Sequence, residues 1–144
     1  MNNPGWVDLQ VNGHNGVNFS DPELTESEFL RAADELFAAG TAVFLPTLIT
    51  SSAEVYRRNL PLIRRAVERH GLAGAVPGIH LEGPFLARGA IGSHNPEWVQ
   101  APSPETVERL YQQAEGFVRL ITVSADAPGA PEAIARARKL GIAV

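Results

Sequence analysis

The stretch GIHLEGPF, residues 78–85, places a histidine and a glutamate two positions apart in a segment that is otherwise apolar. In a strand, His80 and Glu82 would point to the same face. A charged side chain inside a strand usually needs a partner. Glu82 precedes Gly83 and Pro84, a rigid turn that would expose its carboxylate at the rim of a sheet. This position favours a metal-binding or catalytic role for Glu82, whereas His80 is better explained as a hydrogen-bonded core histidine or as one that supports a neighbouring ligand.

Two further sets of polar residues fall where strands would end. In DLQVNGHNG, residues 8–16, the side chains of Asp8, Gln10 and Asn12 would share one face of a strand. Asp8, near the start of the strand, is more often a structural hydrogen-bond acceptor than a catalyst. Gln10 and Asn12 either contact a site or hydrogen-bond each other in the interior. His94 follows in a loop rich in glycine and proline, where it either faces solvent or contacts a ligand.

The elements that must position these residues follow from the apolar pattern. The predicted strands are 6–11, 41–47, 75–83 and 117–124, and the predicted helices are 25–39, 51–70, 103–114 and 130–140. Residues 142–144 are expected to begin a fifth strand. Thr25 and Glu28 have the spacing of a capping box, and Pro61 predicts a kink or a break in its helix. The alternation of strands and helices favours an α/β fold with a parallel sheet and helices outside it.

The length of the chain limits how many strand–helix units it can contain. A (β/α)₈ barrel needs about 200 to 250 residues, with active residues at the carboxyl ends of its strands. The 144 residues therefore predict parallel (β/α) units that form about half of a TIM-type barrel. No G-x-G-x-x-G follows the first strand, so a dinucleotide-binding fold has no support.

The composition excludes several other classes of protein. Apolar residues make up 44%, which is typical of a soluble globular domain, and the net charge of −4 offers no basic surface for nucleic acid. There is no cysteine, so disulfides and thiolate metal sites are ruled out. No apolar run reaches the roughly 18 residues of a membrane span, and the first residues lack the pattern of a signal peptide. We expect a cytoplasmic protein.

Four segments together carry a resemblance to a known family. PGWVDLQVNGHNGVNF, GTAVFLPTLIT, GIHLEGPF and GSHNPEWV resemble the N-acetylglucosamine-6-phosphate deacetylases of the amidohydrolase superfamily. The segments come in the order of that family and at about its spacing. HLEGP followed after about nine residues by HNP is specific to it. The resemblance extends over essentially the whole chain.

The resemblance implies a metal-dependent hydrolase that removes acetate from N-acetyl-D-glucosamine 6-phosphate, a small amino-sugar phosphate. It makes Glu82 a metal ligand and places Ser93 and His94 against the sugar. Gln10 and Asn12 occupy the place where many amidohydrolases carry His-x-His for a second metal. A side-chain amide is a poorer zinc ligand than an imidazole, so one divalent metal ion, zinc by preference, is expected. We expect the complete protein to be a homo-oligomer.

The resemblance also implies that parts of the family's site lie outside this chain. An N-terminal segment would precede it, and two metal-binding histidines, the catalytic aspartate and the phosphate contacts would lie beyond Val144. None of the four histidines here matches the two ligand positions, and no catalytic acid or base is expected in this chain. An apparent one-residue insertion in SADAPGAPE leaves Asp126 without an assigned role. The alternative to part of a deacetylase is a non-catalytic domain that binds a sugar phosphate, or a gene remnant of the same family.

Overall fold

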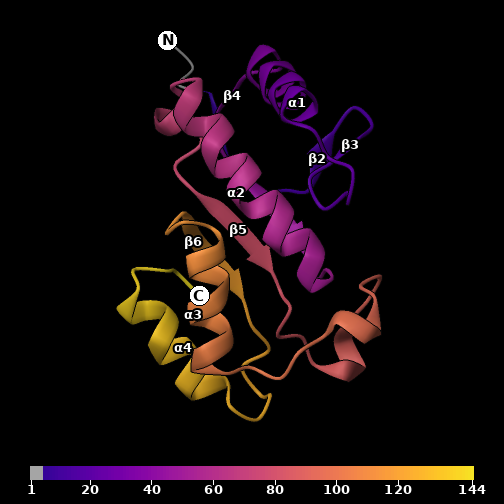
Figure 1. The fold of residues 1–144 in the computed structure, drawn as a ribbon, viewed down its shortest axis with the longest axis vertical. Helices are drawn as coiled ribbons and strands as arrows, with labels where there is room; N and C mark the ends of the chain where they lie inside the picture. The colour runs from indigo at the N-terminus through magenta and orange to yellow at the C-terminus, as the bar shows by residue number, and fades with distance from the viewer. Residues whose placement is uncertain (1–4) are drawn as a thin grey trace.

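The computed structural model describes residues 5–144, apart from the side chain of Arg88, and Figure 1 shows its ribbon. Four strands form one parallel sheet in the order β1-β4-β5-β6. The strands are β1 (Trp6–Val11), β4 (Thr41–Ile49), β5 (Ile79–Glu82) and β6 (Val118–Thr122). β5 is shorter than the predicted 75–83, and at its start the N–H groups of Ala75 and Val76 bond back to the Leu72 carbonyl of the preceding 3-10 turn. The predicted mixture of parallel strands and helices is confirmed.

The expected beginning of a fifth strand at residues 142–144 is present only as a single parallel bridge. Ala143 alone bridges to β6, where its N–H donates to the Arg119 carbonyl at 2.9 Å and its carbonyl accepts from the Ile121 N–H at 3.0 Å. Val144 is 50% exposed and belongs to no strand. A ladder needs consecutive pairs of residues, and within the described residues neither neighbour of Ala143 pairs with β6. Residues 142–144 therefore add one bridge to the edge of β6 and form no strand.

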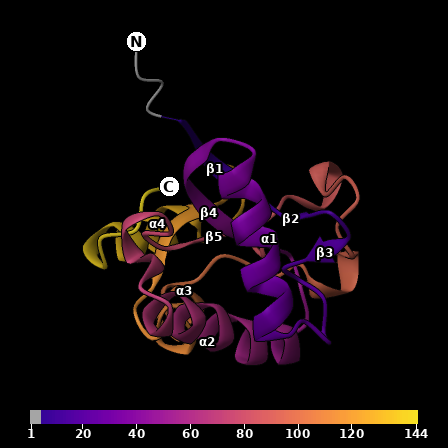
Figure 2. The same ribbon diagram turned by 90° about the horizontal axis from the view of Figure 1, so that it is seen from above.

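Helices cover one face of the sheet. The α-helices are α1 (Glu26–Ala38), α2 (Ala53–Arg69), α3 (Pro104–Gln113) and α4 (Ala130–Lys139), and the 3-10 helices are η1 (Leu72–Gly74), η2 (Arg88–Ala90) and η3 (Pro96–Trp98). Parallel strands in sequential order, joined by right-handed crossovers, place their helices on the same side. Each α-helix accordingly contacts the next, as Figures 1 and 2 show. Within residues 5–144, no helix combines the length and apolar character needed to cross a membrane.

Helix α1 begins and packs as its sequence predicts. The Thr25 side chain accepts a hydrogen bond from the Glu28 N–H, and the Glu28 carboxylate accepts one from the Thr25 N–H at 2.8 Å. This is the reciprocal capping box. Phe29 is fully buried, and Phe37 packs 5.7 Å from the ring of Phe44 on β4. The apolar face of α1 therefore seals one end of the core against the sheet.

Of the kink or break predicted at Pro61, helix α2 does not show the break. The helix runs from residue 53 to residue 69 with the proline inside it. Proline removes one i→i−4 hydrogen bond, and the carbonyl that loses its donor belongs to Arg57, an exposed residue that water can reach. Leu60 and Ile63, on either side of the proline, are fully buried. Their packing outweighs the loss of a single solvent-accessible hydrogen bond.

A short hairpin follows β1 that the strand predictions did not include. β2 (Gly13–His14) pairs antiparallel with β3 (Val17–Asn18). Asn15 and Gly16 form the turn with φ values of 46° and 81°. Two successive positive φ angles are the requirement of a type I′ turn, which Asn-Gly satisfies best. The hairpin directs Val17 and Phe19 into the core.

Buried Asn59 of α2 holds the segment that follows this hairpin. Its side chain is fully buried, and Nδ2 donates to the carbonyl oxygens of Phe19 at 3.0 Å and Asp21 at 2.7 Å. Ser20, between those two residues, accepts a hydrogen bond from the Ile49 N–H at 3.0 Å. The segment is thus fixed both to α2 and to the carboxyl end of β4.

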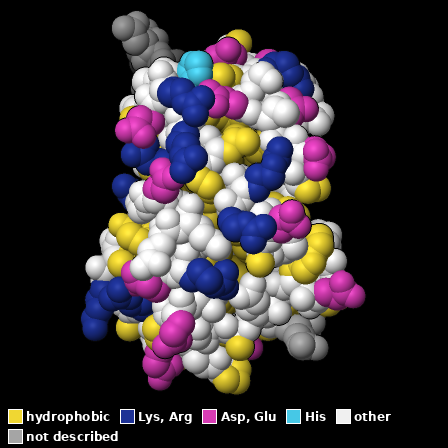
Figure 3. Space-filling model, viewed as in Figure 1, with side chains coloured by type: hydrophobic (Ala, Val, Ile, Leu, Met, Phe, Trp, Pro, Cys, Tyr) yellow, Lys and Arg dark blue, Asp and Glu magenta, His cyan; other side chains and the backbone are white. Residues whose placement is uncertain are grey.

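The outer surface of the helices carries interspersed charges of both signs, as Figure 3 shows for one face. Arg69 of α2 pairs with Glu26 of α1 at 2.8 Å, and Arg65 of α2 pairs with Glu115, which follows α3. The arginines are more than half exposed and the glutamates about a third, so each pair stabilises the fold by no more than about 1 kcal/mol. The helices are therefore held mainly by their buried faces.

We predict that Asn59→Ala lowers the free energy of unfolding by about 2 to 4 kcal/mol, because it removes the donor to the Phe19 carbonyl, removes one of the two donors to the Asp21 carbonyl, and leaves a void. Urea denaturation followed by circular dichroism measures the change. Arg57→Ala, on the exposed side of the same helix, is the control and should shift the free energy by less than about 0.5 kcal/mol. Equal stability of the two variants would contradict the structural role of Asn59.

We also predict that the 144-residue polypeptide self-associates through β1. Trp6, Val7 and Leu9 are 71%, 64% and 57% exposed, and β1 forms one edge of the sheet. An exposed apolar edge strand is a template for pairing with another chain. Light scattering should show a mass that rises with concentration, and Val7→Lys with Leu9→Lys should reduce it. A monodisperse monomer with a cooperative melt would refute the prediction.

Candidate functional site

The candidate site lies at the edge of the sheet where the parallel strands end. Glu82 is the last residue of β5. Its partners in the neighbouring strands are Ile49, the last residue of β4, and Thr122, the last residue of β6. Ile79 and Leu81 are fully buried in the main core, so the alternation along β5 turns His80 and Glu82 to the opposite face. The side chain of Glu82 remains 23% exposed.

The turn after β5 fixes where the carboxylate sits. Gly83 has a φ of 96°, and a Cβ added there would lie 2.2 Å from the hydroxyl oxygen of Thr50. That same hydroxyl donates a hydrogen bond to the carbonyl of Glu82 at 3.3 Å. Both the left-handed backbone and the close approach of Thr50 therefore require glycine after Glu82.

The long loop between β5 and α3 brings His94 back to Glu82. The Nε2 atom of His94 lies 3.8 Å from Oε1 of Glu82. The backbone N–H of Thr50 donates to His94 Nδ1 at 3.3 Å, so in the neutral ring the proton sits on Nε2 and faces the carboxylate. The structure thus brings together two residues that the sequence predicted for one site. Ser93, beside His94, is exposed, and no described contact joins it to Glu82.

Backbone hydrogen bonds close this loop at its base. The Gln100 N–H donates to the carbonyl of Pro84 at 3.0 Å. Ser124, just beyond β6, donates its N–H to the Phe85 carbonyl at 2.8 Å, and its hydroxyl accepts from the Ala87 N–H at 2.7 Å. The loop is therefore anchored to the next strand as well as to itself, which keeps His94 over the strand ends.

The first strand is less regular than the sequence suggested. The ladder pairs Asp8 with Phe44 and Val11 with Pro46, with a register shift between the two pairs. Three steps on β1 thus oppose two on β4, a one-residue bulge. The simple alternation predicted for residues 8–12 is therefore interrupted. The Asp8 carboxylate accepts from the N–H of Gln10 at 3.0 Å, the structural role weighed for it.

Gln10 and Asn12 are both exposed near the end of β1. Asn12 lines a shallow hollow of about 430 Å³ together with His14 and Ile49. Because Ile49 is the neighbour of Glu82 in the ladder, Asn12 belongs to the same edge of the sheet. No hydrogen bond between the side chains of Gln10 and Asn12 is among the described contacts.

His80 is a buried histidine with both ring nitrogens partnered. It is 2% exposed, with Nδ1 3.2 Å from the hydroxyl of Thr47 and Nε2 2.9 Å from the hydroxyl of Thr122. Burial lowers the pKa of the imidazole below its ordinary value, and the Glu82 carboxylate opposes that shift. The interpretation as a hydrogen-bonded core histidine is confirmed. The two threonines escaped prediction because threonine in a strand is also what β propensity favours.

A divalent metal fits this edge only in part. Catalytic zinc takes three protein ligands and a water. Glu82 supplies one carboxylate with the right accessibility, whereas the Nε2 of His94 beside it carries the proton of the neutral ring and offers no lone pair. Among residues 5–144, no group of three histidine, aspartate, glutamate or cysteine side chains is arranged to hold a metal ion. A complete metal site would need ligands from other residues.

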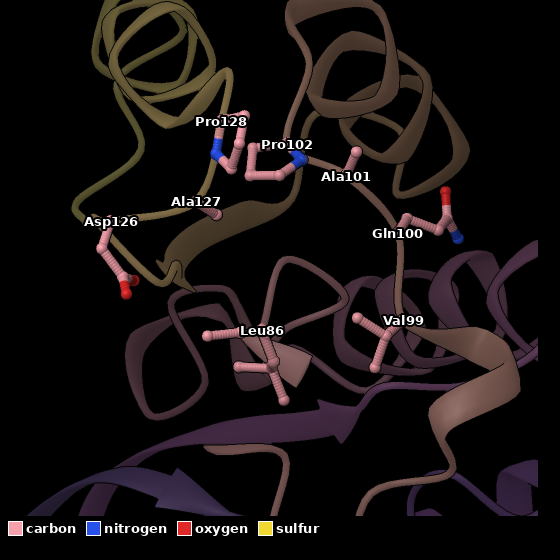
Figure 4. A pocket seen from close by; sticks show the side chains of 9 residues that line it. Leu86, Val99, Gln100, Ala101, Pro102, Asp126, Ala127 and Pro128 are labelled. Carbon is pink, nitrogen blue, oxygen red and sulfur yellow. The ribbon is translucent and has the colours of Figure 1, made fainter. Parts of the chain in front are cut away.

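Asp126 lies at a separate hollow beside the candidate site. A pocket of about 400 Å³ opens between the loop after β5 and the segment after β6, as Figure 4 shows. Its lining is mostly apolar and includes Leu86, Val99 and Pro128, with Asp126 and Gln100 as the polar members. Neither Glu82 nor His94 lines it. The structure therefore separates Asp126 from the residues that meet at the strand end.

No family model matches the chain. Several individual proteins are similar to it in sequence. It is 37% identical over 139 residues to the N-acetylglucosamine-6-phosphate deacetylase of Caenorhabditis elegans, which covers 91% of this chain and 33% of the nematode protein. It is 34% identical over 146 residues to the human protein of the same name, covering 98% of this chain and 35% of the human one. The chain thus spans about a third of the length of these relatives.

Solved structures agree. The crystal structure of N-acetyl-D-glucosamine-6-phosphate deacetylase from Mycobacterium smegmatis superposes with a TM-score of 0.85 at 34% identity, over 96% of this chain and 35% of that one. A mutant of the mycobacterial protein, in complex with N-acetyl-D-glucosamine 6-phosphate, matches equally well. The Thermotoga maritima protein, at 23% identity and a TM-score of 0.79, shares the fold. The chain therefore belongs to the N-acetylglucosamine-6-phosphate deacetylase family.

Proposed function

We propose that this chain supplies one side of the active site of a metal-dependent deacetylase that, as a complete protein, hydrolyses the acetamide of N-acetyl-D-glucosamine 6-phosphate. The observation that carries the proposal is the meeting of Glu82 and His94 at the carboxyl edge of the parallel sheet, 3.8 Å apart. The names of the relatives and the sugar phosphate bound to the mycobacterial mutant support the choice of substrate.

The proposal includes a fold larger than the described sheet. Sequential parallel strands with every crossover helix on one side are the geometry of a (β/α)₈ barrel, and residues 1–144 would form about half of one. The bridge at Ala143, just before Val144, supports a further strand beside β6. The remaining metal ligands, the catalytic aspartate and the phosphate contacts would come from residues beyond Val144. A cytoplasmic location and a homo-oligomeric state stay predictions.

In this proposal each residue of the edge has a distinct task. A bound divalent ion such as zinc would supply a Lewis acid and a water with a pKa near 7. Glu82 would be a carboxylate ligand of that ion. The Nε2–H of His94, oriented by the Thr50 N–H, would donate to an oxygen of the sugar. The exposed hydroxyl of Ser93 would contact the same sugar. General acid–base catalysis would be carried out by a group outside these residues.

The amides of the first strand bear on the number of metal ions. Gln10 and Asn12 lie at the end of β1 and offer neutral oxygens, which bind zinc weakly compared with an imidazole. We therefore propose a single metal ion, with the side-chain amides of Gln10 and Asn12 contacting the bound sugar phosphate. The alternative, a non-catalytic domain that binds a sugar phosphate, shares the His94 and Ser93 contacts but needs no metal at Glu82.

We predict that Glu82→Gln in the complete protein abolishes metal binding and lowers kcat/KM by more than about 100-fold, because a neutral amide replaces a charged ligand. The fold should survive, since Glu82 lies at the rim and outside the core. Metal content by mass spectrometry and turnover of the sugar phosphate are the measurements. Glu97→Gln, an exposed change in the same loop, is the control.

The same prediction can be tested on the 144-residue polypeptide by calorimetric titration with zinc. Binding should be weak and should depend on Glu82, because one carboxylate does not make a zinc site. Sub-micromolar binding that persists in Glu82→Gln would place the metal elsewhere. Sugar-phosphate binding without any metal requirement would favour the non-catalytic alternative.

We predict that His94→Ala raises KM for the sugar phosphate and lowers kcat/KM by about 10- to 100-fold, the loss expected when a hydrogen bond to a ligand is removed. Steady-state kinetics of the complete protein measure both constants. His70→Ala, a change at the exposed end of α2, is the matched control. If His94→Ala has the same kinetic constants as the control, His94 does not contact the substrate and the prediction is wrong.

A further inference from the structure

A line of hydrogen bonds crosses all four strands of the sheet near their carboxyl ends. The Val11 N–H of β1 donates to the hydroxyl oxygen of Thr47 on β4 at 3.1 Å. The same oxygen lies 3.2 Å from Nδ1 of His80 on β5. His80 Nε2 lies 2.9 Å from the hydroxyl of Thr122 on β6. The line follows the strand order β1-β4-β5-β6.

The direction of each hydrogen bond in this line follows from counting protons. Thr47 has one hydroxyl proton, and its oxygen also lies 3.1 Å from the carbonyl of Leu45, which can only accept. Once that proton goes to Leu45, the Thr47 oxygen can only accept, from Val11 and from His80. The Nδ1 atom of His80 must then carry the ring proton. Only this arrangement satisfies the Val11, Leu45 and His80 contacts of Thr47 together.

At the β6 end of the line, His80 accepts a hydrogen bond and Thr122 donates it. His80 is 2% exposed, and in the neutral ring a proton on Nδ1 leaves only a lone pair at Nε2. Thr122 must therefore donate its hydroxyl proton to His80. With that proton committed, the Thr122 oxygen has only lone pairs left for other partners. Thr122 is itself exposed and is the partner of Glu82 in the ladder.

We propose that His80 is a positioning residue whose Nδ1–H tautomer, fixed by Thr47, makes Thr122 a hydrogen-bond acceptor beside Glu82. The acceptor would take a hydroxyl or amide N–H of the bound amino sugar. This role toward a ligand rests on the proposed function. The tautomer itself rests only on the contacts of Thr47. Thr122 thereby becomes part of the candidate site, where it would favour a sugar that presents a hydrogen-bond donor to it.

The tautomer can be measured without any assay of activity. In the ¹⁵N-labelled complete protein, long-range ¹H–¹⁵N correlations of the His80 ring, assigned by their loss in His80→Gln, should show a protonated Nδ1 and an unprotonated Nε2. A protonated Nε2 would overturn the proposal. Because no turnover is involved, this result stands or falls separately from the deacetylase function.

The acceptor role of Thr122 needs a second measurement. Thr122→Val should raise KM for the sugar phosphate by about tenfold with a smaller change in kcat, the loss of roughly one hydrogen bond, and Thr122→Ser should restore it. Thr41→Val, at the start of β4, is the matched control and should leave KM unchanged. An unchanged KM in Thr122→Val, in a protein that turns over the sugar phosphate, would refute the acceptor role. A protein with no turnover at all would refute the deacetylase function and leave the tautomer to decide.

Discussion

The parallel arrangement of the strands is the constraint from which the candidate site follows. Parallel strands require crossovers, and the crossovers here place every α-helix of residues 5–144 on one face, which leaves the other face free of helices. All four strands also end at the same edge. Residues as far apart in the sequence as Asn12, Glu82 and Thr122 therefore lie along the same edge. The loop after β5 adds His94 to the same edge.

The polar residues on this face are arranged by the cost of burying each group. A neutral imidazole with two partners is much cheaper to bury than a carboxylate, and His80 accordingly lies deep while Glu82 stays at the rim. The sequence favoured a site role for Glu82 because a charge at a strand end is unusual, whereas the pattern left His94 open between solvent and ligand, and only the resemblance placed it against the sugar. The structure adds that the two side chains lie 3.8 Å apart. Thr47 and Thr122 could not be predicted, since their hydroxyls acquire meaning only through the strand register that brings them to His80.

Local signals predicted the helices better than the strands. The capping box of Thr25 and Glu28 marked the start of α1 to the residue, because the contacts that make it lie within one turn. A break at Pro61 does not occur, because the cost of the proline is local whereas the packing that outweighs it is tertiary. The turn at residues 15–16 carried a recognisable Asn-Gly signal, but strands of two residues have too little pattern to detect. The bulge in β1 depends on its partner strand and leaves no trace in the sequence.

The closed base of the loop between β5 and α3 has an evolutionary consequence. The Gln100–Pro84 hydrogen bond joins the two ends of the excursion, and Ser124 pins its base through Phe85. Residues between these anchor points can therefore be lengthened, shortened or exchanged without altering the register of strand or helix. A sheet edge built in this way can change which ligands it accepts while the strands and helices that support it stay the same.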